Sequence, residues 1–146
     1  MVNRVIECCG ALIYSLSTKR YLFLLRDHST YAGTWGLAGG KIESGETTKD
    51  TLARELEEEL GQTVHYKKIV PLEKFTSENQ EFIYHTYFIV VESEFVPQLN
   101  HEHRGYTWVS IADHPRPLHP GVWRTFNTPG VIEKIKTVEA TLSSSH

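Results

Sequence analysis

The distribution of hydrophobic and polar residues divides the start of the chain into two strand-like runs. Residues 5–16 and 21–26 are apolar, aromatic and β-branched, whereas residues 17–20 between them are polar. Apolar runs of this kind, separated by a short polar segment, are typical of a β-hairpin. We therefore predict that the chain begins with a hairpin.

Five glycines between residues 31 and 45 interrupt this pattern. Glycine permits backbone conformations and close approaches that side chains forbid, so the segment predicts a loop that can pass close to a ligand. Residues 49–60 follow and are rich in Leu, Ala, Glu and Arg, which favour a helix. Thr47 or Thr48 is expected to cap that helix, and Gly61 to end it. The glycine loop should therefore lead directly into a helix.

The second half of the chain contains three further strand-like runs. Residues 64–75 and 80–91 concentrate β-formers on either side of a polar turn, and residues 106–109 form a shorter run. Three prolines and a glycine then predict a loop over residues 113–121. We expect a second hairpin, one more strand and a long connection.

A last helical stripe closes the chain. Residues 131–140 place apolar side chains at helical spacing, and Pro129 suits the entry to a helix. The final residues offer nothing to bury. We therefore predict one domain over residues 1–141 and a disordered tail over residues 142–146.

Composition fits a single globular domain and narrows the partners. The 146 residues are 40% hydrophobic and 23% charged, and the formal net charge is −3. A net negative chain has no overall field for a polynucleotide or an anionic membrane, so a polynucleotide partner is disfavoured. Cys8 and Cys9 are adjacent, which suits reduced thiols rather than a disulfide, and no apolar run approaches the length of a membrane span. We expect a cytoplasmic protein; a homodimer would be compatible with the sequence.

Glutamates cluster on one side of the helix over residues 49–60. Glu55, Glu58 and Glu59 have i, i+3, i+4 spacing, which brings their carboxylates to one side. Such a run is usually a solvated face, but here the like charges repel one another without a following Lys or Arg. A bound cation would relieve the repulsion. Several oxygen ligands suit Mg²⁺ or Mn²⁺ better than Zn²⁺, and the glycine loop could bring phosphates close.

The residues around this helix resemble the Nudix box, the signature of the Nudix (MutT-like) hydrolase family. The match is Gly40-x5-Glu46-x7-Arg54-Glu55-Leu56-x-Glu58-Glu59-x-Gly61, with all seven fixed Gly, Glu and Arg positions present. Gln62 stands where the family has an aliphatic residue, and Ala38 where proline is common. The resemblance implies an α+β fold, an α/β/α sandwich with a mixed β-sheet flanked by helices.

The resemblance also implies roles for individual residues. Glu58 and Glu59 would bind the metal directly, with the carbonyl of Gly39 as a further ligand. Glu55 would be another ligand or the general base, and Glu102 on a later loop would be the alternative base and a possible ligand. Glu46 and Arg54 would pair and support the ligands. Independently of the resemblance, Arg26 at the end of a strand could contact a substrate phosphate or could be a solvated strand-end arginine. Gly40 and Lys41 are further candidates for substrate contacts.

Several weaker signals remain open. His101 and His103 could chelate a metal, but histidines beside a binding site are the simpler interpretation without further Cys or His ligands nearby. Aromatic residues in strands are more often core than base-stacking residues, and His119 is favoured as part of an ordinary proline loop. The aromatic candidates are Tyr31, Trp35, Phe82 and Tyr84.

The implied function is divalent-metal-dependent hydrolysis of a phosphoanhydride bond in a small nucleoside diphosphate derivative. A nucleoside triphosphate, a dinucleotide or a nucleotide sugar would each qualify. The alternative from another class is a nucleotide-sensing module on the same fold, which would not need every carboxylate. An isomerase would need its own acid–base pair, and none is evident in the sequence.

Overall fold

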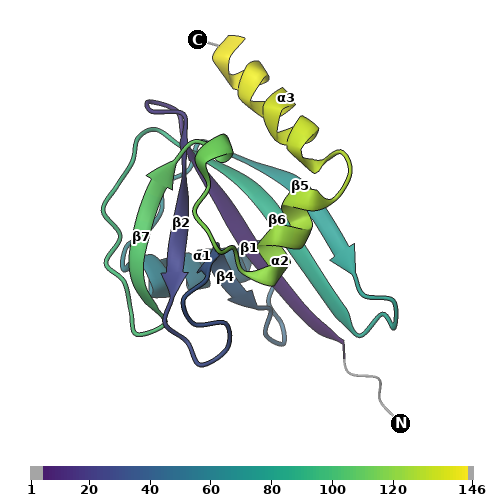
Figure 1. The fold of residues 1–146 in the computed structure, drawn as a ribbon. Helices are drawn as coiled ribbons and strands as arrows, with labels where there is room; N and C mark the ends of the chain where they lie inside the picture. Colours follow the sequence, from purple (N-terminus) through teal and green to yellow (C-terminus); the bar gives the residue numbers. More distant parts are fainter. Residues whose placement is uncertain (1–4, 145–146) are drawn as a thin grey trace.

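The computed structural model describes residues 5–144, which fold around one mixed β-sheet (Figure 1). The strand order is β3-β2-β1-β6-β5, with β4 paired to β1 and β7 paired to β2. The strands are β1 (Ile6–Ser15), β2 (Arg20–Arg26), β3 (Trp35–Gly36), β4 (Ala38–Lys41), β5 (Lys68–Thr76), β6 (Phe82–Val91) and β7 (His103–Val109). The helices are α1 (Thr48–Leu60), the short 3₁₀ helix η1 (Ile111–Asp113), α2 (Pro120–Asn127) and α3 (Val131–Ser144).

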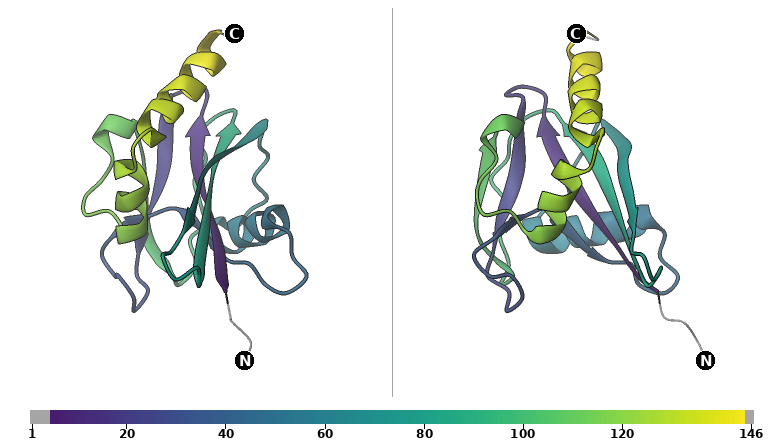
Figure 2. Two further views of the ribbon diagram at one scale, coloured as in Figure 1. Left: turned by 90° about the vertical axis from the view of Figure 1, so that its right-hand side faces the viewer. Right: turned by 45° about the vertical axis from the view of Figure 1, so that its right-hand side comes forward.

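Helices cover both faces of the sheet: α1 lies on one side, and α2 and α3 on the other (Figure 2). Successive side chains of a strand point to opposite faces, and β1 is buried on both. Its odd-numbered residues pack with Leu52, Leu56 and Leu60 of α1, whereas Leu12 and Tyr14 pack with α2 and α3. The expected α/β/α sandwich is confirmed.

The sheet splits between β1 and β2. Strand β1 pairs with β2 only from Ile13 to Ser15, and along the same edge it pairs with β4 from Cys8 to Ala11. The rest of β2 turns away and pairs with β3 and β7. Because the two halves of β1 have different neighbours, the sheet opens where β2 leaves β1.

The expected start and end of the glutamate helix are confirmed. The side chain of Thr47 accepts a hydrogen bond from the backbone N–H of Asp50, and Asp50 reciprocates in a capping box. Gly61 ends the helix in the left-handed conformation, with φ 69°. Both hairpins are present too, although β5 begins only at Lys68 and β7 already at His103.

Two predictions about the last third were wrong. The loop expected over residues 113–121 contains η1 at its start, and at its end Pro120 begins α2, because proline fits the first turn of a helix and His119 caps it. The tail expected from residue 142 is instead helical to Ser144, because Leu142 is buried against the core. Residues 145–146 of that tail, and residues 1–4 of the predicted domain, lie outside the described residues.

None of the helices within residues 5–144 is long and apolar enough to cross a membrane.

Candidate functional site

A cleft of about 400 Å³ opens where the sheet splits. Its walls come from distant parts of the chain: β1, β4, β6, the end of α1, the turn before β7 and the first turns of α2. One end carries acidic groups, and the other end lies against α2. The acidic end is lined by Gly39, Gly40, Glu59 and Glu102, and the α2 end by residues that include Thr86, His119, Val122 and Thr125.

Glu59 is the most deeply buried of the helix carboxylates, with a side chain only 3% exposed. Its Oε2 accepts a hydrogen bond of 2.8 Å from the backbone N–H of Gly39. A side chain at position 39 would collide with the backbone of β1, because its Cβ would lie 2.1 Å from the carbonyl oxygen of Cys9. Burial raises the pKa of Glu59 to about 9, and the charges of Glu55 and Glu102 add to this effect. Without a bound cation the carboxyl group therefore keeps its proton at pH 7, and a bound cation would stabilise its ionised form.

Glu102 reaches the cleft from the turn that precedes β7, and Asn100 fixes that turn. Oδ1 of Asn100 accepts a hydrogen bond of 3.0 Å from the backbone N–H of Glu102. Nδ2 of Asn100 donates a hydrogen bond of 3.2 Å to the backbone carbonyl of Glu58. One amide thus ties the end of α1 to the turn that carries Glu102.

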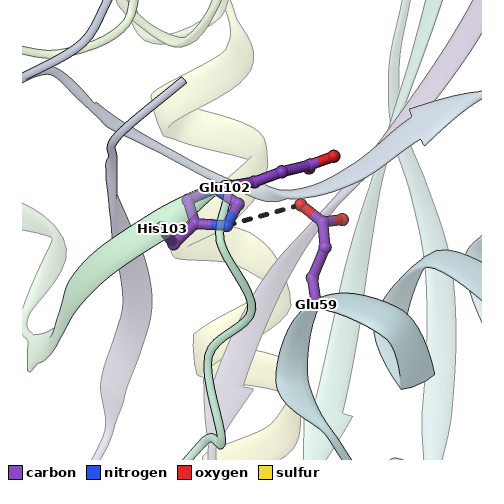
Figure 3. Close-up of side chains that lie close together, drawn as sticks. All are labelled: Glu59, Glu102 and His103. Atoms are coloured by element: carbon purple, nitrogen blue, oxygen red, sulfur yellow. Dashed lines mark ion pairs between the residues drawn. The ribbon is translucent and has the colours of Figure 1, made fainter.

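His103 is the neighbour of Glu102 and faces Glu59 (Figure 3). Its Nδ1 lies 3.7 Å from Oε1 of Glu59 and has no hydrogen-bond partner, although it is buried. Burial lowers the pKa of His103 to about 4, and the charges of Arg26 and His28 contribute, so the imidazole is neutral at pH 7. One ligand atom from each of Glu59, Glu102 and His103 lies within 4.8 Å of the others.

Arg54 organises the carboxylates on the outer side of α1. Its Nε donates to Glu46 at 2.7 Å, its Nη1 donates to Glu55 at 2.9 Å, and the same nitrogen lies 3.7 Å from Glu58. The Arg54 hydrogen bonds hold the pKa of Glu46 at about 2. Burial nevertheless raises the pKa of Glu55 above its ordinary value. The expected pairing of Glu46 with Arg54 is therefore present.

The predicted site residues other than Glu46 and Arg54 divide into three groups. Gly39, Gly40, Glu59, Glu102 and Arg26 line the cleft. Glu55 packs directly behind Gly40, where an added Cβ would lie 2.5 Å from the Glu55 carboxyl group.

Glu58 and Lys41 form the third group, which lies outside the cleft. The Glu58 side chain is 56% exposed and faces Arg54, so the three helix glutamates converge less closely than their spacing predicts. Lys41 is exposed at the end of β4 and is absent from the cleft wall. It contributes its backbone carbonyl, which accepts a hydrogen bond of 3.2 Å from Arg54.

The α2 end of the cleft contains groups that sequence reasoning missed. Thr86 of β6 is 2% exposed, lines the cleft and has a buried Oγ1 without a hydrogen-bond partner. Arg124 and Thr125 enter the wall because Pro120 starts a helix instead of extending a loop. Among the weaker candidates, the rings of Tyr31 and His119 pack edge to face, with 4.9 Å between their centroids. Both residues line the cleft, as do Phe82 and Tyr84. Trp35 packs against the core on the α2 side.

The sequence and the structure of this chain are both similar to those of known proteins from one family. The model of the NUDIX domain matches residues 9–128. The nucleoside triphosphatase NudI of Escherichia coli is 32% identical over 97 residues, which cover 60% of this chain and 69% of that protein. The crystal structure of a MutT NUDIX hydrolase from Burkholderia pseudomallei superposes with a TM-score of 0.69 at 28% identity, covering 83% of this chain and 95% of that one.

A more distant structure shares the fold. It is the NUDIX domain of NrtR from Shewanella oneidensis, complexed with ADP ribose. It covers 97% of this chain and 90% of that one, with a TM-score of 0.64 and 16% identity.

Proposed function

The chain belongs to the NUDIX family and is a Nudix hydrolase, and from this premise we propose that it cleaves a phosphoanhydride bond in a nucleoside diphosphate derivative, with divalent metal ions bound at the acidic end of its cleft. One observation carries the proposal. The buried carboxyl group of Glu59 sits in the cleft wall with Glu55 and Glu102 nearby and no Lys or Arg hydrogen-bonded to it among the described residues. A bound cation would neutralise these carboxylates and would at the same time bind the phosphate oxygens of a substrate.

The donor set fits a divalent ion. Glu59 and Glu102 offer carboxylate oxygens close to the buried Nδ1 of His103, which lacks a partner. Glu55, Glu58 and the carbonyl of Gly39 are further proposed ligands. Oxygen-rich sites of this kind suit Mg²⁺ or Mn²⁺. When bound, such an ion supplies neutralisation of phosphate oxygens and a lower pKa for the attacking water.

We assign the general base to Glu102 in preference to Glu55. Glu102 lines the cleft, and Asn100 holds its backbone against α1. Glu55 lies behind Gly40 and is hydrogen-bonded to Arg54, which competes for the lone pairs that a base needs. In this proposal Glu102 accepts the proton of the attacking water, and Glu55 serves as a ligand.

The cleft suggests how a substrate is oriented. The absence of a Cβ at Gly40 lets the Glu55 carboxyl group pack against the backbone of β4 at the cleft wall. Arg26 lines the same cleft and supplies a positive charge for substrate phosphates. The organic part of the substrate would then extend toward Thr86 and His119 at the α2 end. The name of the NudI relative, nucleoside triphosphatase, favours a nucleoside triphosphate among the candidate substrates.

A nucleotide-binding module without catalysis is the second candidate. It has support from the NrtR domain, whose structure contains ADP ribose on the same fold. Binding alone, however, does not require a buried carboxylate at the cleft, a base candidate beside it and an arginine network behind it. Hydrolysis accounts for all three.

Measurement of product release separates these functions. The purified chain is incubated with nucleoside triphosphates, dinucleoside polyphosphates, nucleotide sugars and ADP ribose, with and without Mg²⁺ or Mn²⁺, and the products are identified by mass. We expect metal-dependent cleavage of a phosphoanhydride bond in at least one class. Tight binding across the panel with no cleavage in either metal would instead support the binding module.

A further inference from the structure

His103 carries a buried nitrogen that the protein itself leaves without a partner. Its side chain is 2% exposed, and Nδ1 accepts or donates no hydrogen bond. Buried polar groups of folded proteins nearly always have a partner, because an unpaired one costs about 1–3 kcal/mol. The atom is therefore available to bind a ligand or an ion.

The chain holds this nitrogen in a fixed place. Asn100 closes the turn before β7 and accepts at its carbonyl a hydrogen bond of 3.3 Å from the N–H of His103. Strand β7 then begins at His103, which pairs across the sheet with Arg26. The side chain consequently points inward, toward the end of α1, where Glu59 faces it (Figure 3).

The distance between the two side chains fits a shared ion better than a direct bond. Nδ1 lies 3.7 Å from Oε1 of Glu59, which is longer than a hydrogen bond of about 2.7–3.2 Å. Two ligands held about 2.1 Å from one octahedral ion lie roughly 3.0 Å apart when adjacent and roughly 4.2 Å apart when opposite. The observed separation is below roughly 4.2 Å, so one ion can reach both atoms. A carboxylate oxygen of Glu102 lies within 4.8 Å of both.

We propose that His103 is a nitrogen ligand of the metal site that contains Glu59, and that it makes this site bind Mn²⁺ more tightly than Mg²⁺. The proposal rests on the proposed function for the statement that the cleft is a metal centre. Imidazole suits later and softer first-row metals, whereas Mg²⁺ prefers oxygen and gives up its water reluctantly. A site with both nitrogen and oxygen ligands therefore prefers Mn²⁺ to Mg²⁺ more strongly than a site made only of carboxylates does.

Pulsed electron paramagnetic resonance of the Mn²⁺-loaded full chain tests the proposal without reference to activity. Modulation from a directly bound histidine nitrogen is expected in the wild type, and it should change when histidine is labelled with ¹⁵N. His103→Gln should abolish the modulation, and His101→Gln, an exposed histidine two residues away, should leave it intact. Bound Mn²⁺ without nitrogen coupling would overturn the proposal. This result would follow if a water molecule, and not His103, were bound to the ion.

Calorimetric titration with each ion gives a second readout that does not depend on nitrogen spectroscopy. We expect the ratio of Mg²⁺ to Mn²⁺ dissociation constants to fall roughly 10-fold or more in His103→Gln and to stay constant in His101→Gln. An unchanged ratio in a folded His103→Gln variant would contradict the assignment.

Hydrolysis and nitrogen coupling can fail separately. Metal-dependent turnover without nitrogen coupling would leave the proposed function intact and overturn the role of His103. Nitrogen coupling at Mn²⁺ without turnover of any substrate would support His103 and overturn the hydrolase.

Discussion

The guanidinium of Arg54 holds the carboxylate of Glu46 through two hydrogen bonds, 2.7 Å from Nε to Oε2 and 2.9 Å from Nη2 to Oε1. The remaining terminal nitrogen, Nη1, donates to Glu55 at 2.9 Å. Since Thr51 also donates to Glu46, at 2.8 Å, the loop that carries Glu46 is anchored to the helix at two points. Arg54 therefore fixes the position of Glu55 relative to the loop that carries Glu46.

Removal of this link should weaken the metal site more than the fold. Arg54→Ala frees Glu55 to move away from its position beside the metal site, so we expect a loss of roughly 10–100-fold in metal affinity and turnover. Lys49→Ala, which removes an exposed cation from the same helix, is the matched control. Equal metal affinity in the two variants, measured by calorimetry, would contradict the role given to Arg54.

The choice of base can be tested by the pH dependence of the rate. Glu102→Gln should lower kcat by about 10²–10⁴-fold with little change in KM, and the acidic limb of the pH–rate profile should disappear. Glu55→Gln should instead raise the metal concentration needed for half-maximal rate. If the acidic limb is lost in Glu55→Gln and survives in Glu102→Gln, the two assignments are exchanged.

The metal-free protein should lose stability in alkaline solution. Burial raises the pKa of Glu59 from 4.5 to about 9, so the folded state holds a proton that the unfolded state has lost, and stability falls as pH rises through this window. Burial lowers the pKa of His103 from 6.5 to about 4, which has the opposite effect below pH 6.5. The two effects oppose each other at acidic pH, and above pH 6.5 only that of Glu59 remains.

Urea denaturation in EDTA between pH 6.5 and 9 measures this effect. One proton corresponds to a slope of at most about 1.4 kcal/mol per pH unit. Glu59→Gln should remove most of the slope, because the amide does not titrate. The part that remains near pH 9 comes from Cys8 and Cys9, because burial raises the pKa of both thiols above 9.0. A slope that is the same in the wild type and in Glu59→Gln would place the titrating group elsewhere.

Thr86 should contribute to substrate binding and not to folding. Its Oγ1 is buried and unpaired in the cleft wall, so Thr86→Val removes an unsatisfied polar atom and should leave the Tm unchanged or slightly higher. A substrate whose polar group meets Oγ1 would lose that bond, which corresponds to a KM about 3–10-fold higher at unchanged kcat. Steady-state kinetics with an unchanged KM for every accepted substrate would rule out this contact.

Local sequence patterns predicted the elements around Glu59 but not the environment of its carboxylate. The capping threonine, the helix formers and Gly61 act through neighbours in the chain, so the bounds of α1 follow from the sequence. The different fates of Glu58 and Glu59 do not, because i, i+3, i+4 spacing places both on one side. Only the packing of β4 and β7 buries one and leaves the other exposed.

The α2 end of the cleft was harder to predict for the same reason. Prolines at 115, 117 and 120 favoured a loop, yet Pro120 occupies the first turn of a helix, where its missing N–H costs nothing. A threonine inside an apolar strand such as Thr86 gives no local signal of function, and it joins the cleft wall only through the tertiary arrangement of β6 and α2.

The rate of product release from a nucleoside triphosphate at saturating Mg²⁺ or Mn²⁺ tests directly whether Glu59 is part of a metal-dependent hydrolytic centre. Wild type and Glu57→Gln, which alters an exposed carboxylate of the same helix, should turn over equally and only with metal. Glu58→Gln and Glu59→Gln should lose on the order of 100-fold or more while retaining the circular dichroism spectrum of the wild type. A folded Glu59→Gln variant with a near-wild-type, metal-dependent rate would show that Glu59 is not part of the hydrolytic centre.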